Sequence, residues 1–153
     1  MRVAITANRN LTREDEWTIR RSMRGLNELR PDEIIFGGAR GGDTVALITA
    51  ATEGRHVDTR LVVIVPCRVS DQPYDAQEAI RRYADEVIEL GLRITRDDNW
   101  AAFKKRNCAM NDRGSHLGAF WNASYNSGTW HCLNDAIRKK HPWWVTPIEG
   151  GDK

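Results

Sequence analysis

Residues 33–53, EIIFGGARGGDTVALITAATE, contain the part of the chain that decides its fold. The apolar, β-branched run Glu33–Gly37 predicts a buried strand. Four of the six residues from 37 to 42 are glycine, which permits a tight turn with positive φ angles. The apolar segment Thr44–Glu53 then predicts a short helix. A strand, a glycine-rich turn and a helix in direct succession are typical of a parallel α/β fold.

The same alternation extends outward to both ends of the chain. Further strands are expected at Arg2–Ala7, Arg60–Pro66, His116–Trp121 and Trp143–Ile148, with Leu92–Thr95 as a weaker sixth. Further helices are expected after a capping Thr12, over Asp75–Leu90, over Asn99–Asn111 and over Gly128–Lys140. Pro147 suits the end of an edge strand. The sequence therefore predicts one doubly wound α/β domain over residues 1–148, with a mainly parallel sheet of five to six strands, helices on both faces, and residues 149–153 as a loose tail.

The composition agrees with one globular domain that works in the cytoplasm. The 153 residues carry 23 basic and 21 acidic side chains, and 41% of them are hydrophobic. No signal region, membrane-spanning run or paired-cysteine motif is present in the sequence, so we expect neither a membrane partner nor a metal or other cofactor. Of the 23 cations 18 are arginine, a bias that fits either anionic ligands or ordinary surface ion pairs.

Three loops follow the expected strands at the edge of the sheet where such folds bind ligands. One contains Asn8 and Arg9. The second is the glycine-rich stretch, in which Arg40 could close over a phosphate while Asp43 either caps the next helix or binds the ligand. The third ends in Ser127, Gly128 and Thr129 at a helix start, which suits a second phosphate or a simple capping serine.

Several motifs in this order carry a resemblance to the SLOG superfamily. They are TANR at 6–9, FGGARGGD at 36–43, RN at 106–107, AFW at 119–121 and SGT at 127–129. More narrowly, the chain is similar to the small bacterial and phage YspA-like proteins, which are related to DNA-processing protein A and to the LONELY GUY phosphoribohydrolases. The resemblance implies a Rossmann-like fold with a pocket for a nucleotide or nucleotide-derived ligand.

Carried over by position, the resemblance implies twelve ligand-binding residues: Asn8, Arg9, Gly37, Gly38, Arg40, Gly41, Asp43, Arg106, Asn107, Ser127, Gly128 and Thr129. Two departures bear on chemistry. Ala7 and Asn8 stand where the family has Gly-Ser, and Cys132 stands where LONELY GUY enzymes have the glutamate that assists N-glycosidic cleavage. No catalytic residue is assigned.

Two further features have alternative interpretations. Arg106 lies beside Lys104 and Lys105, so it belongs either to a solvated basic helix face or to the ligand site. Trp121 and Tyr125 could stack on a base. If Trp143 and Trp144 are exposed, they indicate a subunit interface, and we expect a homo-oligomer.

Three functions fit these observations. The first is a sensor or sequestering protein that binds a nucleotide-derived small molecule. The alternative is a hydrolase that cleaves an N-glycosidic or phosphoribosyl bond of a nucleotide. The second alternative is binding of single-stranded nucleic acid, which the nearly neutral net charge disfavours.

Overall fold

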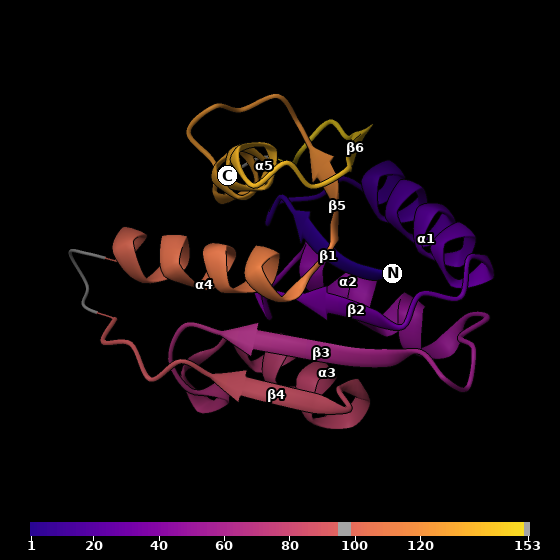
Figure 1. The fold of residues 1–153 in the computed structure, drawn as a ribbon, viewed down its shortest axis with the longest axis horizontal. Coiled ribbons are helices and arrows are strands. Elements are labelled where there is room, and N and C mark those ends of the chain that lie inside the picture. The colour runs from indigo at the N-terminus through magenta and orange to yellow at the C-terminus, as the bar shows by residue number, and fades with distance from the viewer. Residues whose placement is uncertain (95–98, 152–153) are drawn as a thin grey trace.

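Strands and helices alternate along the chain in the computed structural model, which describes residues 1–94 and 99–151 (Figure 1). The elements in chain order are β1 (Arg2–Ala7), α1 (Arg13–Glu28), β2 (Glu33–Phe36), α2 (Gly42–Thr52), β3 (Arg60–Val65), the 3₁₀ turn η1 (Val69–Asp71), α3 (Tyr74–Tyr83), β4 (Glu86–Glu89), α4 (Trp100–Arg113), β5 (His116–Trp121), α5 (Gly128–Arg138) and β6 (Trp143–Pro147).

The strands form one parallel sheet in the order β4-β3-β2-β1-β5-β6. Helices α1, α2 and α3 pack against one face, and α4 and α5 pack against the other (Figure 1). The connection through α4 returns from the edge strand β4 to β5, which pairs with the far side of β1. This is a doubly wound, Rossmann-like α/β domain, as the sequence predicted.

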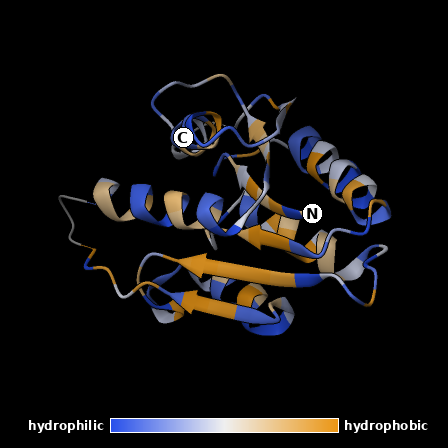
Figure 2. Cartoon of the chain, viewed as in Figure 1, coloured by the Kyte–Doolittle hydropathy of each residue, from blue (hydrophilic) through white to orange (hydrophobic). Residues whose placement is uncertain are grey.

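Alternating side chains of the central strands fill two apolar cores. On β2, Ile34 and Phe36 are buried beneath α1 and α2, while Ile35 points to the core under α4 and α5. β3 is hydrophobic along nearly its whole length (Figure 2). A strand buried on both faces needs such a continuous apolar run, which is why the central strands could be found from the sequence. No described helix is long and apolar enough to cross a bilayer.

Most predicted boundaries agree with the structure to within one or two residues. β1 and β5 have the predicted bounds, and Pro147 ends the edge strand β6. Thr12 caps α1 through a capping box, in which its hydroxyl accepts the Asp15 N–H and the Asp15 carboxylate accepts the Thr12 N–H.

The prediction of one helix over Asp75–Leu90 is wrong in its second half. α3 ends at Tyr83, and residues 86–89 form the edge strand β4. Asp85, just before this strand, aligns it with β3: its N–H donates to the Leu61 carbonyl at 2.8 Å and its carboxylate accepts the Leu61 N–H at 2.8 Å. The sixth strand is therefore not Leu92–Thr95: residues 92–94 form no strand, and Thr95 lies outside the described residues.

The C-terminal residues 149–151 are held against the domain rather than loose. The buried Asp15 carboxylate accepts the Glu149 N–H at 2.8 Å and the Gly150 N–H at 2.9 Å. Gly151 donates its N–H to the Asn10 carbonyl at 2.9 Å. The sequence contained no signal for this contact because the acceptor lies 134 residues away on another element. The division of the chain at residue 148 stays a prediction.

Asp15→Asn is expected to lower the free energy of unfolding by about 1–3 kcal/mol, because the new amide NH₂ faces backbone N–H groups that need an acceptor. Burial favours a higher pKa for Asp15, but the backbone N–H groups of Thr12, Glu149 and Gly150 together hold that pKa below its ordinary value. The stabilisation is thus complete above the unfolded pKa of about 3.9 and is lost as pH falls through the lower folded value. Urea unfolding from pH 7 to pH 2.5 measures it, with the exposed Glu14→Gln as control. An Asn variant as stable as wild type at pH 7 would contradict the assigned role.

Candidate functional site

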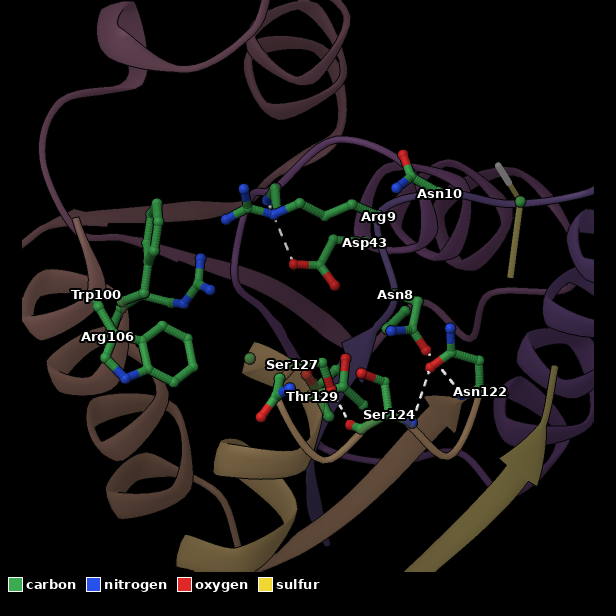
Figure 3. A pocket seen from close by; sticks show the side chains of 17 residues that line it. Asn8, Arg9, Asn10, Asp43, Trp100, Arg106, Asn122, Ser124, Ser127 and Thr129 are labelled. Carbon is green, nitrogen blue, oxygen red and sulfur yellow. Dashed lines mark hydrogen bonds between the residues drawn. The ribbon is translucent and has the colours of Figure 1, made fainter. Parts of the chain in front are cut away.

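A cavity of about 380 Å³, hereafter the switch cavity, lies at the carboxyl ends of β1 and β5 (Figure 3). The connections that leave β1 and β5 here lead to opposite faces of the sheet. Such a place is called a topological switch point, and open α/β folds bind their ligands there. Its volume falls within the range of about 300–1,000 Å³ that ligand pockets have. It is lined by residues 6–10, Ala39, Asp43, Trp100, Phe103, Arg106, Asn122, Ser124, residues 126–129 and Gly151.

The glycine loop, residues 37–42, is shaped by close approach to other backbone segments. Gly38 and Gly41 have φ angles of +72° and +78°. A Cβ atom at Gly41 would lie 1.9 Å from the Arg9 carbonyl oxygen, and one at Gly42 would lie 2.2 Å from the Ala7 Cβ. These glycines therefore bring the start of α2 against the end of β1 without lining the switch cavity themselves.

Asp43 does not cap the helix. α2 begins at Gly42 with Gly41 as its N-cap, so the capping interpretation of Asp43 is wrong. Its side chain instead turns back, and Oδ2 accepts the Ala39 N–H at 3.3 Å. Only 5% of Asp43 is exposed, and Oδ1 has no hydrogen-bond partner among the described residues. Burial raises the pKa of Asp43 above its ordinary value, although the charges of Arg106 and Arg9 oppose that rise.

Arg106 belongs to the cavity and not to a solvated basic face. It is 7% exposed, whereas Lys104 and Lys105 are exposed. Its Nη1 donates to the Gly37 carbonyl at 2.6 Å, and its Nε donates to the Asn107 Oδ1 at 2.9 Å. The guanidinium is thus held in one orientation at the cavity wall.

Asn107 supports the site from behind. Its Nδ2 donates to the Gly128 carbonyl at 3.1 Å, so it connects α4 to the start of α5. Ser127 caps α5: its hydroxyl accepts the Trp130 N–H at 3.1 Å and donates to the Ser124 carbonyl at 2.8 Å. Asp43 in the first turn of α2 and Gly128 and Thr129 at the start of α5 both line the switch cavity, so the positive ends of two helix dipoles face it and favour an anion.

Asn8 and Arg9 lie between these two helix starts. The Asn8 Oδ1 accepts the Asn122 N–H at 2.9 Å, which joins the first loop to the loop after β5. The Arg9 guanidinium lies over the Phe103 ring, 4.7 Å from its centroid. Asn8 therefore has a structural partner in the loop after β5, while Arg9 presents its charge to the cavity.

Arg40 lies outside the switch cavity. It is exposed and lines a neighbouring, shallower cavity of about 300 Å³ together with Leu11 and Glu16. The two cavities share Arg9, Asn10 and Gly151. The proposal that Arg40 binds the ligand thus requires a ligand that extends beyond the switch cavity.

The aromatic residues of the cavity differ from the expected ones. Trp121 stacks on Trp130 at 5.2 Å between ring centroids and meets Tyr125 edge-on, and none of the three lines the cavity. Trp100 and Phe103 line it instead. The sequence predicts that these two residues lie on a helix, but which face of that helix is directed to the cavity depends on how α4 packs against the sheet.

Cys132 is completely buried next to Asn111. Burial raises the pKa of its thiol to about 12, so the thiol is neutral and is no nucleophile. Cys132 therefore supplies no ionised group at neutral pH.

Gly37→Ala is expected to abolish ligand binding while leaving the fold intact. Gly37 has no positive φ, but a Cβ there would lie 2.9 Å from the Arg106 Cζ and 3.0 Å from the Asp43 Oδ2. Both side chains must then move, whereas the backbone need not. Circular dichroism and calorimetric titrations with candidate ligands test this, and Gly25→Ala on α1, where a Cβ meets nothing within 4 Å, is the control. Wild-type affinity in the Gly37 variant would contradict the arrangement described here.

The fold and the cavity define a single-domain Rossmann-like protein with a ligand-sized cavity at its switch point. Solved structures share this fold. DNA processing protein A from Streptococcus pneumoniae has a TM-score of 0.73 and 16% identity, over 94% of this chain and 49% of that one. The same protein from Helicobacter pylori, which binds single-stranded DNA, has a TM-score of 0.72 and 20% identity, over 99% of this chain and 68% of that one. The chain spans about half the length of the Streptococcus protein.

The molybdenum cofactor binding protein from Rippkaea orientalis also matches, with a TM-score of 0.66 and 15% identity over 95% of this chain and 76% of that one. No protein-family model and no curated protein matches the sequence. These likenesses show the fold, and it is the Rossmann-like fold that the resemblance to the SLOG superfamily implied.

Proposed function

We propose that the chain binds a nucleotide or nucleotide-derived small molecule in the switch cavity and acts as a sensor or sequestering protein. The observation that carries this proposal is the convergence of two helix N-termini and two guanidinium groups, Arg9 and Arg106, on one cavity with an aromatic wall. Helix starts and arginines suit phosphate, and the rings of Trp100 and Phe103 suit a base.

A calorimetric titration with AMP, ADP-ribose and a short oligothymidylate tests this function. We expect saturable one-to-one binding of at least one of the two nucleotides. Adenosine and ribose 5-phosphate, which each lack one part of AMP, should bind more weakly than AMP itself. If no nucleotide binds and none protects the protein against thermal unfolding, the proposal is wrong.

Binding of single-stranded nucleic acid is the second candidate. It is supported by the shared fold with the Helicobacter protein and by an exposed cation–π pair at the cavity mouth, where Lys104 Nζ lies 5.3 Å from the Trp100 ring centroid. The net charge of +2 argues for few phosphate contacts. Nucleic-acid binding would show an affinity for oligothymidylate that falls steeply with salt, whereas a small-molecule site would prefer the mononucleotide.

Hydrolysis of an N-glycosidic bond has less support because the buried Cys132 replaces the acid of the LONELY GUY pattern. Chromatography after incubation with nucleoside monophosphates would reveal any released base. A homo-oligomer also stays a prediction: Trp143 on the edge strand β6 is 50% exposed, which suits an interface, and sedimentation would measure the assembly state.

A further inference from the structure

The switch cavity is graded from a charged inner end to an aromatic mouth. Asp43, Arg106 and Thr129 are each at most 7% exposed, whereas Trp100 at the other end is 42% exposed. In Figure 3 the Asp43 carboxyl lies among the side chains that line the cavity, with Trp100 and Arg106 of α4 on one side and Ser127, the N-cap of α5, and Thr129 of α5 below. A ligand with a polar end and a flat end therefore has one favoured orientation.

The side chains of Asp43 and Arg106 both lie next to Gly37, but no hydrogen bond joins them among the described residues. The position of an absent Gly37 Cβ is 2.9 Å from the Arg106 Cζ and 3.0 Å from the Asp43 Oδ2. Among the described residues the Arg106 donors reach Gly37 and Asn107, and the Asp43 Oδ1 reaches nothing. A buried polar atom without a partner costs about 1–3 kcal/mol, which a ligand can relieve.

An ionised carboxylate is poorly supported at this place. Among the described residues its carboxyl accepts the Ala39 N–H at 3.3 Å, and the Ala7 N–H is the other backbone group that favours its charged form. A buried charge with so little hydrogen bonding is strongly disfavoured. A neutral carboxylic acid instead has an O–H to donate, and it leaves the charges of Arg106 and Arg9 free to attract an anion. Such an acid can share one oxyanion with a guanidinium.

We propose, on the basis of the function proposed above, that the inner end of the switch cavity is an oxyanion subsite, in which Asp43 as a neutral acid and Arg106 hold the same phosphate group. The phosphate of a nucleotide then lies innermost, between the starts of α2 and α5, and its base lies outermost against Phe103 and Trp100. Ionisation of Asp43 places a further negative charge beside the already anionic phosphate, so binding is coupled to proton uptake.

The other titratable groups around Asp43 do not obscure the pH dependence that its ionisation would give to ligand binding. Arg106 on α4 and Arg9 after β1 are the charged groups that act on Asp43. Burial lowers the pKa of Arg106 and the Asp43 carboxyl opposes that change, but a guanidinium stays protonated in the neutral range. On α5, burial raises the pKa of Cys132 to about 12 and lowers the pKa of His131, so both are neutral at pH 7 and above. Within residues 1–94 and 99–151, the charges that act on Asp43 are therefore those of Arg106 and Arg9.

The test is the Kd for AMP between pH 6 and pH 9 in wild type and in Asp43→Asn, whose amide keeps a donor at every pH. The ratio of the wild-type Kd to the variant Kd removes the titration of AMP itself. We expect the ratio to rise with pH, approaching tenfold per unit once Asp43 ionises in the free protein. Adenosine, which lacks the phosphate, should bind far more weakly than AMP.

Calorimetry of the wild type in buffers of different ionisation enthalpy measures the number of protons taken up on binding, and so tests the same coupling without a variant. Proton uptake should approach one per AMP at the alkaline end. A constant or falling ratio without proton uptake, or adenosine binding as tightly as AMP, would overturn the oxyanion subsite alone, because AMP binding itself would persist. Failure of the wild type to bind AMP, ADP-ribose or inorganic phosphate would overturn the subsite and the proposed function together.

Discussion

Arg106→Ala is expected to weaken AMP binding by about 30-fold or more, because truncating one partner of a buried charge pair costs about 2–5 kcal/mol and each 1.4 kcal/mol is a factor of ten. The side chain is 7% exposed and fixed by Gly37 and Asn107, so little ordering is needed when the ligand arrives. Calorimetric titration of the variant measures the loss.

Lys105→Ala is the matched control, since Lys105 precedes Arg106 on α4 and is exposed. It should change the affinity by less than about threefold, in keeping with a solvent-exposed charge. Arg106→Lys retains the positive charge but loses the planar guanidinium that can bind a phosphate with two hydrogen bonds. Its affinity for AMP should lie between those of the Arg106→Ala and Lys105→Ala variants. If Arg106→Ala folds and binds AMP as tightly as Lys105→Ala, Arg106 is not part of the site.

Gly41→Ala is expected to have the largest effect on stability, a loss of about 2–5 kcal/mol. A β-carbon there meets the Arg9 carbonyl at 1.9 Å, and a backbone group cannot rotate away as a side chain can. The φ of +78° and ψ of −122° also lie in a region that favours glycine. The clash forces apart the first loop and the start of α2, both of which contribute residues to the lining of the switch cavity.

Gly54→Ala isolates the contribution of backbone conformation. Gly54 has a φ of +82°, but a Cβ there meets nothing within 4 Å. It should lower the free energy of unfolding by about 1–2 kcal/mol, the ordinary cost of a left-handed residue. Urea denaturation of both variants gives the difference as the cost of the clash. Equal losses would mean that the packing of the glycine loop against Arg9 contributes no stability.

The part of the fold that could be predicted is the part that local sequence specifies. β1 and β5 are bounded by turn residues and carry apolar side chains to both faces. β4 could not be found, because the helical spacing of Ala76, Ile80 and Tyr83 continues to Val87. Its strand conformation depends on distant partners: Arg113 binds Glu86 at 2.7 Å, and Asp85 pairs with Leu61 of β3.

The features of the site also divide into those that local sequence specifies and those that depend on tertiary packing. The glycine loop and the start of α5 were predictable because turn and capping residues act within a few positions of themselves. The role of Asp43 depended on whether α2 starts at Gly42 or later, and that of Arg106 on how α4 rotates against the sheet. Arg40 was expected to close over the ligand, but the loop directs it to the neighbouring cavity. Trp100 and Phe103 were seen only as a helical pattern.

The central claim is that a nucleotide occupies the cavity between the starts of α2 and α5, and an amide NMR titration of the ¹⁵N-labelled protein with AMP tests it most directly. The amides of residues 37–43 and of residues 127–129 should shift together, with one saturation curve, and both sets should stay unshifted in Gly37→Ala. Shifts confined to other surfaces, or no saturable shift of either set with AMP or ADP-ribose, would contradict the claim.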